Sequence, residues 1–353
     1  MRCRCSCSPI TSPSPRARTS TSQETSPNRS RSSNRSQSIA YGESGVTERQ
    51  NKPLVAGVEL GGTKCICILA RGPDEIEDRV QLPTTRPEET LSAIEAVLER
   101  WSGFSALGIA SFGPVSIDPH AGDYGHITST PKPGWANQDV AARLRRKAGV
   151  PTGFHTDVVG AALAEARWGA AKGLPDIAYA TVGTGIGVGL IAGGKPVDGL
   201  THSEFGHIRP VRVPGDDWIG CCPYHGACLE GLAAGPAIQA RTGIPGPDLP
   251  ADHPAWDLVA HALGQLLHAL VLTGVPRRIV MGGGVMVGTD HLFPRVRAAM
   301  SKSLAGYVAL PEVADADTFV VPPALGGNAG PLGAIVLGAQ ALGEQLQTSF
   351  MGA

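Results

Sequence analysis

VELGGTKCICI at residues 58–68 runs from one short apolar stretch, through a glycine turn, into a second apolar stretch. The segment TVGTGIGVGLI at residues 181–191 repeats this pattern near the start of the second half of the chain. Both stretches contain β-branched residues, which are typical of strands, and their glycines permit tight turns. We therefore expect two related halves, each of which opens on a strand, a glycine turn and a second strand.

The segments around these two hairpins alternate between the patterns of strands and helices. Further strands are predicted at residues 105–114, 151–157, 277–283 and 318–323. Helices are predicted at residues 86–101, 136–149, 158–173, 229–242, 253–273, 289–304 and 330–345. Strand pairs that precede strand–helix alternation predict a mixed sheet covered by helices, which is an α/β fold.

Length and composition limit the classes of protein to consider. The 353 residues are too many for a single typical core and suggest two domains. The chain has no run of about 18 apolar residues and no apolar segment typical of a secretory signal. We therefore expect a cytoplasmic protein with no membrane partner.

The first forty residues differ in composition from the rest of the chain. They hold seven Arg, one Glu and twelve Ser and almost nothing apolar, which predicts a disordered tail over residues 1–52. Because the whole chain has 30 basic and 31 acidic residues, this basic tail leaves an acidic remainder. That balance argues against nucleic acid as the main ligand. A solvated extension, or a start codon assigned too early, explains the tail better than an RNA-binding or phosphorylated appendage.

Residues with metal-binding side chains cluster at positions 207–228, in the early part of the second half. His207, Cys222, His225 and Cys228 follow the pattern H-x14-C-x2-H-x2-C. Two thiolates and two imidazoles suit a tetrahedral Zn2+ ion, and a closed set of four ligands leaves no position for a catalytic water. We predict a structural zinc site, with Cys221 as a spare ligand. The competing interpretation is that two of the four side chains are merely buried.

The glycine turns alone indicate phosphate binding only weakly. GVELGGTK at residues 57–64 is close to a P-loop, but Thr63 precedes Lys64 where a P-loop has Lys before Ser or Thr. GTGIGVG and GGGVMVG do not supply the G-x-G-x-x-G pattern, with its helix and partner acid, that dinucleotide sites use. Two turns that face each other across a cleft would nevertheless offer backbone N–H groups to a polyphosphate from both sides.

Seven segments are considered together, in the order in which they occur along the chain: GVELGGTK, LGIASFGPVSIDPH, YGHITSTPKPGW, HTDVVGAALAEARWGA, TVGTGIGVGLI, HSEFGHI and CPYHGACLEGLAAGPAI. This set resembles the bacterial ROK-family fructokinases, from about Leu54 to about Leu342. The resemblance implies an actin-like ATPase (ribonuclease H-like) fold with two lobes around a central cleft. The implied lobes cover residues 53–157 and 158–345, and a short C-terminal tail follows at 346–353.

The resemblance implies ATP-dependent transfer of the γ-phosphate to the 6-hydroxyl of D-fructose, which gives fructose 6-phosphate and ADP. A sugar hydroxyl is a poor nucleophile, so a carboxylate must accept its proton. Asp157 matches the family's general base, although its position also suits an ordinary helix N-cap. Glu204, His207 and Glu230 match sugar-binding residues, and the zinc would hold the backbone that carries them.

The resemblance also assigns the nucleotide side of the site. Two phosphate-binding turns and one nucleoside-facing turn match the residues Gly61, Gly62, Thr63, Lys64, Thr184, Gly185, Gly282, Gly283 and Gly284. Glu59 matches a residue near Mg2+ and its waters. We thus expect ATP, Mg2+ and structural Zn2+ as cofactors, fructose and ATP as partners, and a homodimer.

Three positions depart from the family pattern. Val159 stands where the family has an amide, LGGNAG at 325–330 replaces LGDDAG, and Leu60 stands where Ala is common. These changes bear on rate and on preference among fructose, mannose and glucose rather than on reaction class. A sugar-responsive repressor would need an N-terminal helix-turn-helix, and the sequence of residues 1–52 has none of the apolar periodicity of such a motif. A catalytically silent, zinc-containing sugar-binding protein would not need Asp157 and both phosphate turns.

Overall fold

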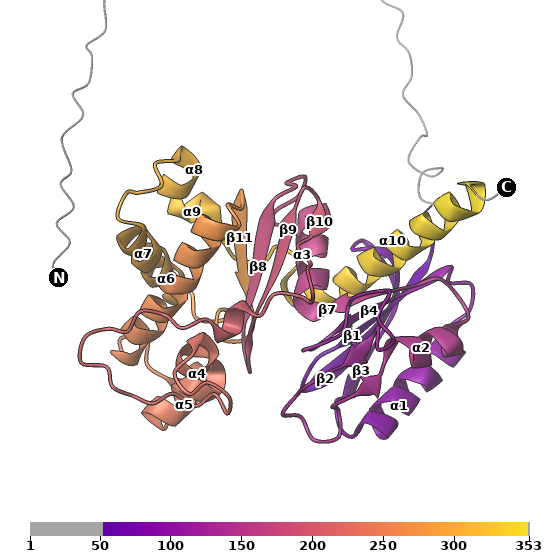
Figure 1. Cartoon of the computed structure of the whole chain (residues 1–353), viewed down its shortest axis with the longest axis horizontal. Helices are drawn as coiled ribbons and strands as arrows, with labels where there is room; N and C mark the ends of the chain where they lie inside the picture. Colours follow the sequence, from indigo (N-terminus) through magenta and orange to yellow (C-terminus); the bar gives the residue numbers. More distant parts are fainter. Residues whose placement is uncertain (1–51, 352–353) are drawn as a thin grey trace, which may run out of the picture. The chain divides into compact units, whose positions relative to one another are not determined.

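The computed structural model describes the backbone of residues 52–351 and the side chains of residues 52–345. The predicted disordered tail, apart from its last residue, lies outside the described residues, as do the last two residues of the predicted C-terminal tail. Within the described part, two five-stranded sheets form the framework of the fold (Figure 1). A small additional sheet pairs β5 (His126–Ile127) with β6 (Gln138–Asp139).

The first sheet has the strand order β3-β2-β1-β4-β7. Its strands are β1 (Val55–Leu60), β2 (Lys64–Gly72), β3 (Glu75–Pro83), β4 (Ala106–Ser111) and β7 (Thr152–Thr156). The pairs β1–β2 and β2–β3 are antiparallel, whereas β1–β4 and β4–β7 are parallel. The first glycine turn therefore lies at the edge where the parallel strands β4 and β7 also end.

The second sheet repeats this arrangement with the order β10-β9-β8-β11-β12. Its strands are β8 (Ile177–Val182), β9 (Ile186–Ala192), β10 (Lys195–Pro196), β11 (Arg278–Gly282) and β12 (Val320–Val321). The first three strands again pair antiparallel, and β8–β11 and β11–β12 are parallel. The expected α/β class and the two related hairpins are thus confirmed.

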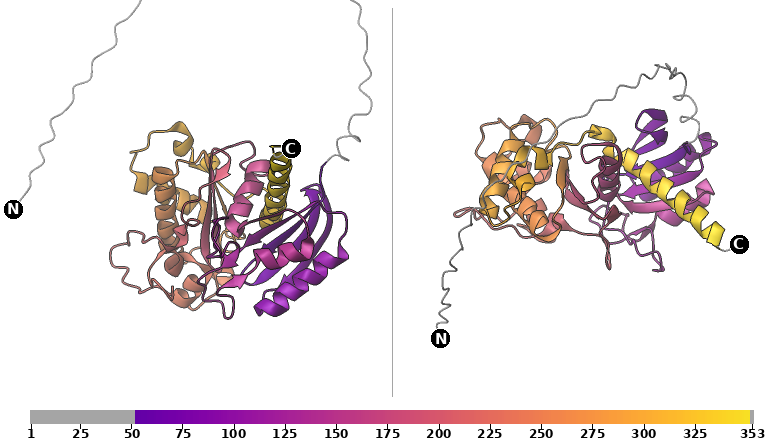
Figure 2. Two further views of the ribbon diagram at one scale, coloured as in Figure 1. Left: turned by 45° about the vertical axis from the view of Figure 1, so that its right-hand side comes forward. Right: turned by 90° about the horizontal axis from the view of Figure 1, so that it is seen from above.

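Helices surround both sheets. They are α1 (Pro87–Arg100), α2 (Ala141–Ala148), α3 (Asp157–Trp168), α4 (Leu229–Ala233), α5 (Gly235–Thr242), α6 (Ala255–Thr273), α7 (Leu292–Leu304), α8 (Pro311–Ala314), α9 (Ala316–Phe319) and α10 (Ala329–Met351). Helix α10 packs along strands of the first sheet and against α3, which in turn contacts β8 and β9 (Figure 2). A β-carbon at Gly333 of α10 would collide with the backbone of Gly160 in α3, so only glycine permits this close approach.

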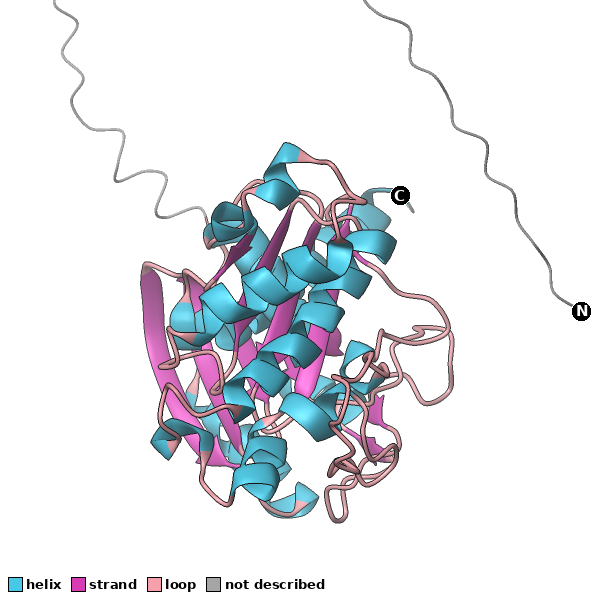
Figure 3. Cartoon of the chain, turned by 90° about the vertical axis from the view of Figure 1, so that its left-hand side faces the viewer, coloured by secondary structure: helices cyan, strands magenta, loops and turns pink. Residues whose placement is uncertain are grey.

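The core of the second half lies between its sheet and the helix pair α6 and α7, which cover the strands in Figure 3. Leu263, Leu267 and Val296 are fully buried members of this core. Helix α6 is long and apolar enough, by length and composition alone, to cross a membrane, although the sequence holds no unbroken apolar run of that length. Its packing in the core accounts for its apolar composition.

Several elements differ from the sequence prediction, and three of these differences concern the larger elements. Strand β3 is absent from the prediction because this edge strand is largely exposed and carries several charged residues. The predicted helix 229–242 divides into α4 and α5, since Pro236 in the first turn of α5 cannot donate a backbone hydrogen bond. Helix α10 continues through residues 346–351, which the sequence predicts as a C-terminal tail. The same helix packs on the first sheet, although the predicted second lobe covers residues 158–345. That division into lobes stays a prediction.

Candidate active site

The carboxyl ends of β1, β4 and β7 meet at one edge of the first sheet. Leu60, Ser111 and Thr156 end these strands in matching register. Glu59 near the end of β1, the first glycine turn and Asp157 are therefore brought to the same edge, where ligands usually bind in sheets with parallel strands.

Asp157 is the first residue of α3, and its neighbour Thr156 is the N-cap. Thr156 has an extended backbone, and its Oγ1 accepts a hydrogen bond from Val159 N at 3.3 Å. The carboxylate of Asp157 accepts from the next backbone N–H, that of Val158, at 2.8 Å. The alternative interpretation of Asp157 as the N-cap is therefore wrong, because the capping oxygen comes from Thr156.

Burial is the main cause of unusual proton affinity at this edge. It raises the pKa of Asp157 to about 7, and the negative charge of Glu204 acts in the same direction. Burial, followed by the charge of Asp157, also raises the pKa of Glu59 to about 7. Asp157 therefore lies within electrostatic range of both Glu204 and Glu59. A carboxylate with a pKa near 7 is well matched to accepting a proton at neutral pH.

Glu59 lies between the first turn and the start of α10. A β-carbon at Gly330, in the first turn of α10, would collide with its carboxylate. The ammonium group of Lys64, at the start of β2, and the more weakly acting guanidinium of Arg79 both lower the pKa of Glu59 against the effect of burial. Burial and nearby basic groups thus act on the pKa of Glu59 in opposite directions.

The first glycine turn directs two of its backbone N–H groups away from the protein's own acceptors. The carbonyl of Gly61 accepts a hydrogen bond from Thr84 Oγ1 at 2.8 Å, and the carbonyl of Gly62 accepts from Lys132 Nζ at 2.6 Å. The N–H groups of Gly62 and Thr63 have no acceptor among the described residues. Such unpaired, neighbouring N–H groups form an anion-binding surface.

The second glycine turn has a similar pair of unpaired donors. Gly183 N donates to Gly185 O at 2.9 Å, and Gly183 O accepts from Gly235 N, at the start of α5, at 2.8 Å. The N–H groups of Thr184 and Gly185 have no acceptor in the part of the chain that the structure describes. Both predicted phosphate turns therefore offer two free backbone donors.

A third glycine turn, Gly282–Gly284, follows β11 and lies beside the second. Gly283 has φ of 88°, which favours glycine, and a β-carbon there would collide with Val182 at the end of β8. Val285 N donates to Val182 O at 2.8 Å. The two turns are thus fixed side by side at the carboxyl ends of β8 and β11.

Glu230 connects the second turn to the predicted sugar-binding residues. Its Oε2 accepts a hydrogen bond from Ile186 N at 3.0 Å, and a β-carbon at Gly185 would stand 2.7 Å from the same oxygen. Burial raises the pKa of Glu204, and the charge of Glu230 contributes in the same direction while His202 and His207 oppose it. His207 and Glu230 therefore both lie within electrostatic range of Glu204.

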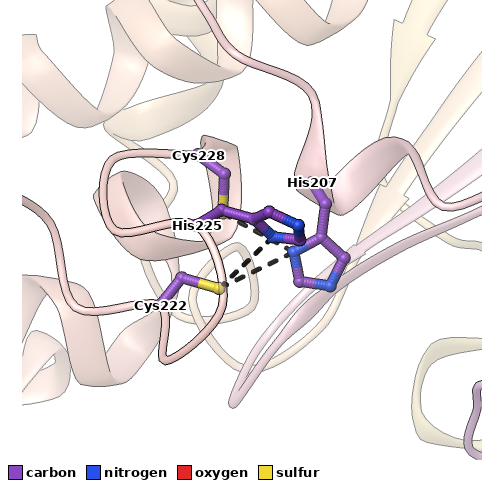
Figure 4. Close-up of side chains that lie close together, drawn as sticks. All are labelled: His207, Cys222, His225 and Cys228. Atoms are coloured by element: carbon purple, nitrogen blue, oxygen red, sulfur yellow. Dashed lines mark hydrogen bonds between the residues drawn. The ribbon is translucent and has the colours of Figure 1, made fainter. Parts of the chain in front are cut away.

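The four predicted metal ligands converge, as Figure 4 shows, with their ligand atoms all within 4.8 Å of one another. His207 Nδ1 lies 3.5 Å from Cys228 Sγ and 3.8 Å from Cys222 Sγ, and His225 Nδ1 lies 3.8 Å from Cys222 Sγ. An ion with ordinary zinc bond lengths and tetrahedral angles would separate sulfur and nitrogen ligands by about 3.6 Å. The residues therefore fit Zn2+. The exposed Cys221 lies outside this group.

The metal-binding group adjoins both acidic sugar candidates. Cys228 is the N-cap of α4, whose first turn contains Glu230, and its Sγ accepts from Gly231 N at 3.4 Å. His207 ends a short 3-10 turn that begins directly after Glu204. Because Nδ1 of His207 faces the sulfurs, its Nε2 is the nitrogen left for another partner.

Three residues of this region have no role in the sequence prediction. Lys132 and Thr84 hold the first turn, and His202 accepts from Val115 N at 3.0 Å while its Nδ1 lies 3.5 Å from Glu204 Oε1. Lys132 lies within YGHITSTPKPGW and His202 within HSEFGHI. Their position as polar residues inside segments that resemble the family could have indicated a role in the site. Thr84 has no such signal.

Two departures from the family pattern are core positions. Leu60 is fully buried in the core of the first half, and Val159 is buried between α3, the second sheet and α10. Neither side chain is among the polar groups of the site, and residues 325–330 form the short turn that leads into α10.

Comparison with known proteins gives a consistent result. The ROK family model matches residues 55–341. The chain is 41% identical to a fructokinase from Pediococcus pentosaceus over 82% of this chain and 99% of that protein. It is also 41% identical to a fructokinase from Zymomonas mobilis over 82% of this chain and 97% of that protein.

Solved structures agree with the sequence comparison. A ROK family glucokinase from Streptomyces griseus, in complex with glucose and AMPPNP, aligns with a TM-score of 0.65 and 26% identity over 81% of this chain and 99% of that chain. Together with the doubled sheet topology, this confirms the predicted actin-like ATPase (ribonuclease H-like) fold. The chain belongs to the ROK family.

Proposed function

We propose that this chain is an ATP-dependent fructokinase, which transfers the γ-phosphate of ATP to the 6-hydroxyl of D-fructose and gives fructose 6-phosphate and ADP. The observation that carries the proposal is 41% identity to two fructokinases over nearly their whole length. The AMPPNP complex of the glucokinase supports ATP as the phosphate donor.

Asp157 is the proposed general base. It accepts the 6-hydroxyl proton as the sugar oxygen bonds to the γ-phosphorus and the bond from that phosphorus to the bridging oxygen breaks, leaving its electron pair on ADP. With a pKa of about 7, Asp157 is partly ionised at neutral pH and basic enough to take the proton. Its position at the same sheet edge as the first glycine turn supports this role.

The nucleotide-binding assignments follow from the three turns. Free N–H groups of Gly62, Thr63, Thr184 and Gly185 would bind phosphate oxygens, and the Gly282–Gly284 turn would admit the nucleoside. Glu59 would hold Mg2+ through its waters. When bound, that ion neutralises charge on the transferred phosphoryl group.

Zn2+ is the proposed structural metal at His207, Cys222, His225 and Cys228, supported by their donor types and spacing. The residues bound to it flank Glu204 and Glu230, the proposed sugar ligands. The metal would therefore fix two separate stretches of backbone that meet the sugar hydroxyls.

A panel of sugars with Mg2+ and ATP, followed by ADP formation, tests the substrate. We expect the highest kcat/KM with D-fructose and lower values with D-mannose and D-glucose, and the product should be fructose 6-phosphate. A clear preference for glucose, or no ADP formation with any hexose, would reject the proposal.

A cytoplasmic homodimer completes the proposal. Sedimentation of the purified chain at several concentrations measures the oligomeric state, and fractionation of the source cells measures the location. A monomer at micromolar concentration would exclude the homodimer.

A further inference from the structure

The first glycine turn is held from behind by two side chains that the proposed function leaves without a role. Each free N–H group belongs to a peptide unit whose carbonyl is already bound. The Gly61 carbonyl, bound by Thr84, shares a peptide with the N–H of Gly62; the Gly62 carbonyl, bound by Lys132, shares one with the N–H of Thr63. Because C=O and N–H point in opposite directions in a trans peptide, both N–H groups are turned away from these side chains.

Lys132 is unusual among lysines in its partners. Its ammonium donates to two neutral carbonyls, Gly62 O at 2.6 Å and Thr84 O at 3.3 Å. No carboxylate among the described residues forms an ion pair with it. A cation bonded to a carbonyl polarises that peptide and strengthens its N–H as a donor. The charge of Lys132 is therefore directed through the Gly62–Thr63 peptide.

The loop that carries Lys132 is firmly anchored. Pro131 and Pro133 flank the lysine and restrict its backbone. Trp135 is fully buried, donates through Nε1 to Thr85 O at 2.8 Å, and packs edge-to-face on Phe112 with ring centroids 5.4 Å apart. The lysine is thus attached to the segment that also supplies Thr84.

Thr84 closes the arrangement on the other side of the turn. Its own N–H donates to Thr63 O at 3.0 Å and its Oγ1 donates to Gly61 O, while its carbonyl accepts from Lys132. Three successive carbonyls of the turn, those of Gly61, Gly62 and Thr63, are therefore occupied by this one pair of residues.

We propose that Lys132 and Thr84 are positioning residues that aim and strengthen the N–H groups of Gly62 and Thr63 toward the phosphates of a bound nucleotide. This inference rests on the proposed kinase function. The lysine acts through the Gly62–Thr63 peptide, on the side opposite to the free N–H of Thr63.

Three variants test the proposal: Lys132→Met, which keeps the stem and removes the charge, Lys132→Arg, which keeps the charge, and Lys172→Met, which removes an exposed lysine elsewhere. Lys132→Met should raise both the KM for ATP and the Kd for Mg-AMPPNP about tenfold, the effect of losing one charge-assisted hydrogen bond. The KM for fructose should not change, Lys132→Arg should recover part of the affinity, and Lys172→Met should match the wild type.

Thr84→Val tests the contribution of Thr84 separately, because it removes the hydroxyl that binds Gly61 O and keeps the side-chain volume. In the double variant with Lys132→Met, the loss of Mg-AMPPNP affinity should differ from the sum of the single losses, since both residues hold one turn. An unchanged Kd for Mg-AMPPNP in Lys132→Met would overturn the proposal, as would equal losses for fructose and nucleotide. Titration with Mg-AMPPNP needs no turnover, so wild-type chain that binds it yet phosphorylates no fructose would reject the proposed substrate alone.

Discussion

The two glycine turns have the same backbone pattern but different support. In the first turn, two carbonyls accept hydrogen bonds from the side chains of Thr84 and Lys132. In the second turn, one carbonyl accepts from the backbone N–H of Gly235, and Glu230 accepts from the N–H that opens β9. Backbone hydrogen bonds support both turns, and the first turn is held in addition by a cation and a hydroxyl, the second by a carboxylate.

The two turns should therefore be sensitive to different substitutions. Backbone hydrogen bonds survive most side-chain substitutions. A single substitution, in contrast, can remove the hydroxyl of Thr84 or the ammonium group of Lys132. The support of the second turn comes from α4 and α5, which directly follow Cys228 of the metal-binding group. The metal should therefore govern the second turn and leave the first unaffected.

The largest effect is expected from Asp157→Asn, which alters neither turn. Because Asn cannot accept the hydroxyl proton, kcat should fall by roughly 10²–10⁴ while the Kd for Mg-AMPPNP stays the same. Thr156 remains as the N-cap, so stability should change little. The matched control is Asp139→Asn, in β6 just before α2, where the carboxylate accepts from Ala142 N. A kcat within a few-fold of wild type would transfer the general-base role to another carboxylate.

Removal of the metal should come next in size. Cys222→Ser should lower Tm by roughly 5–6 °C, the shift for about 3–4 kcal/mol in a chain of this size, because metal binding contributes to folding. It should also lower kcat/KM about 10–100-fold through displacement of Glu230. Zinc content, Tm and kinetics are the measurements. Cys221→Ser is the control and should retain zinc; equal zinc loss in both variants would contradict the ligand set in Figure 4.

Glu230 allows the support of the second turn to be separated from sugar binding. Glu230→Gln keeps an oxygen for Ile186 N–H, so the KM for ATP should be unchanged while the KM for fructose rises. Glu230→Ala removes the acceptor as well, and the KM for ATP should then rise about tenfold, as for a lost hydrogen bond to a charged group. Equal KM values for ATP in the two variants would show that Glu230 does not support the turn.

Local patterns were enough to predict the hairpins and the metal-binding group. Each hairpin is a contiguous stretch in which glycines interrupt β-branched runs, and three of the four metal ligands lie within seven residues. The fourth, His207, is predicted because its imidazole completes a tetrahedral set with two thiolates and a second imidazole. Short-range chemistry of this kind is visible in a single sequence.

The supports of the turns could not be predicted in the same way. Lys132 and Gly62 are 70 residues apart, and Glu230 and Ile186 are 44 apart. Such pairs form only once the sheet edges bring their segments together. The N-cap of α3 shows the other limit, since Thr156 and Asp157 are both good caps and only the backbone geometry distinguishes them.

The smallest expected effect concerns stability and pH at the edge of the first turn. Burial raises the pKa of Glu59 and of Asp157 to about 7, well above that of an unfolded carboxyl. Between the unfolded and folded pKa values the folded chain holds more protons, so this contribution to stability is present at low pH and is lost as pH rises through 7. Glu59→Gln removes one such group.

We therefore expect the Tm of Glu59→Gln minus the Tm of the wild type, both measured without nucleotide or Mg2+, to increase by a few degrees from pH 5 to pH 8. For the control Glu89→Gln, at an exposed position of α1, the Tm difference from the wild type should stay constant over the same pH range. A difference between Glu59→Gln and wild type that stays constant with pH would mean that Glu59 is already ionised in the folded chain. In that case the charge of Lys64 would outweigh burial, and the first turn would carry a standing ion pair that the second lacks.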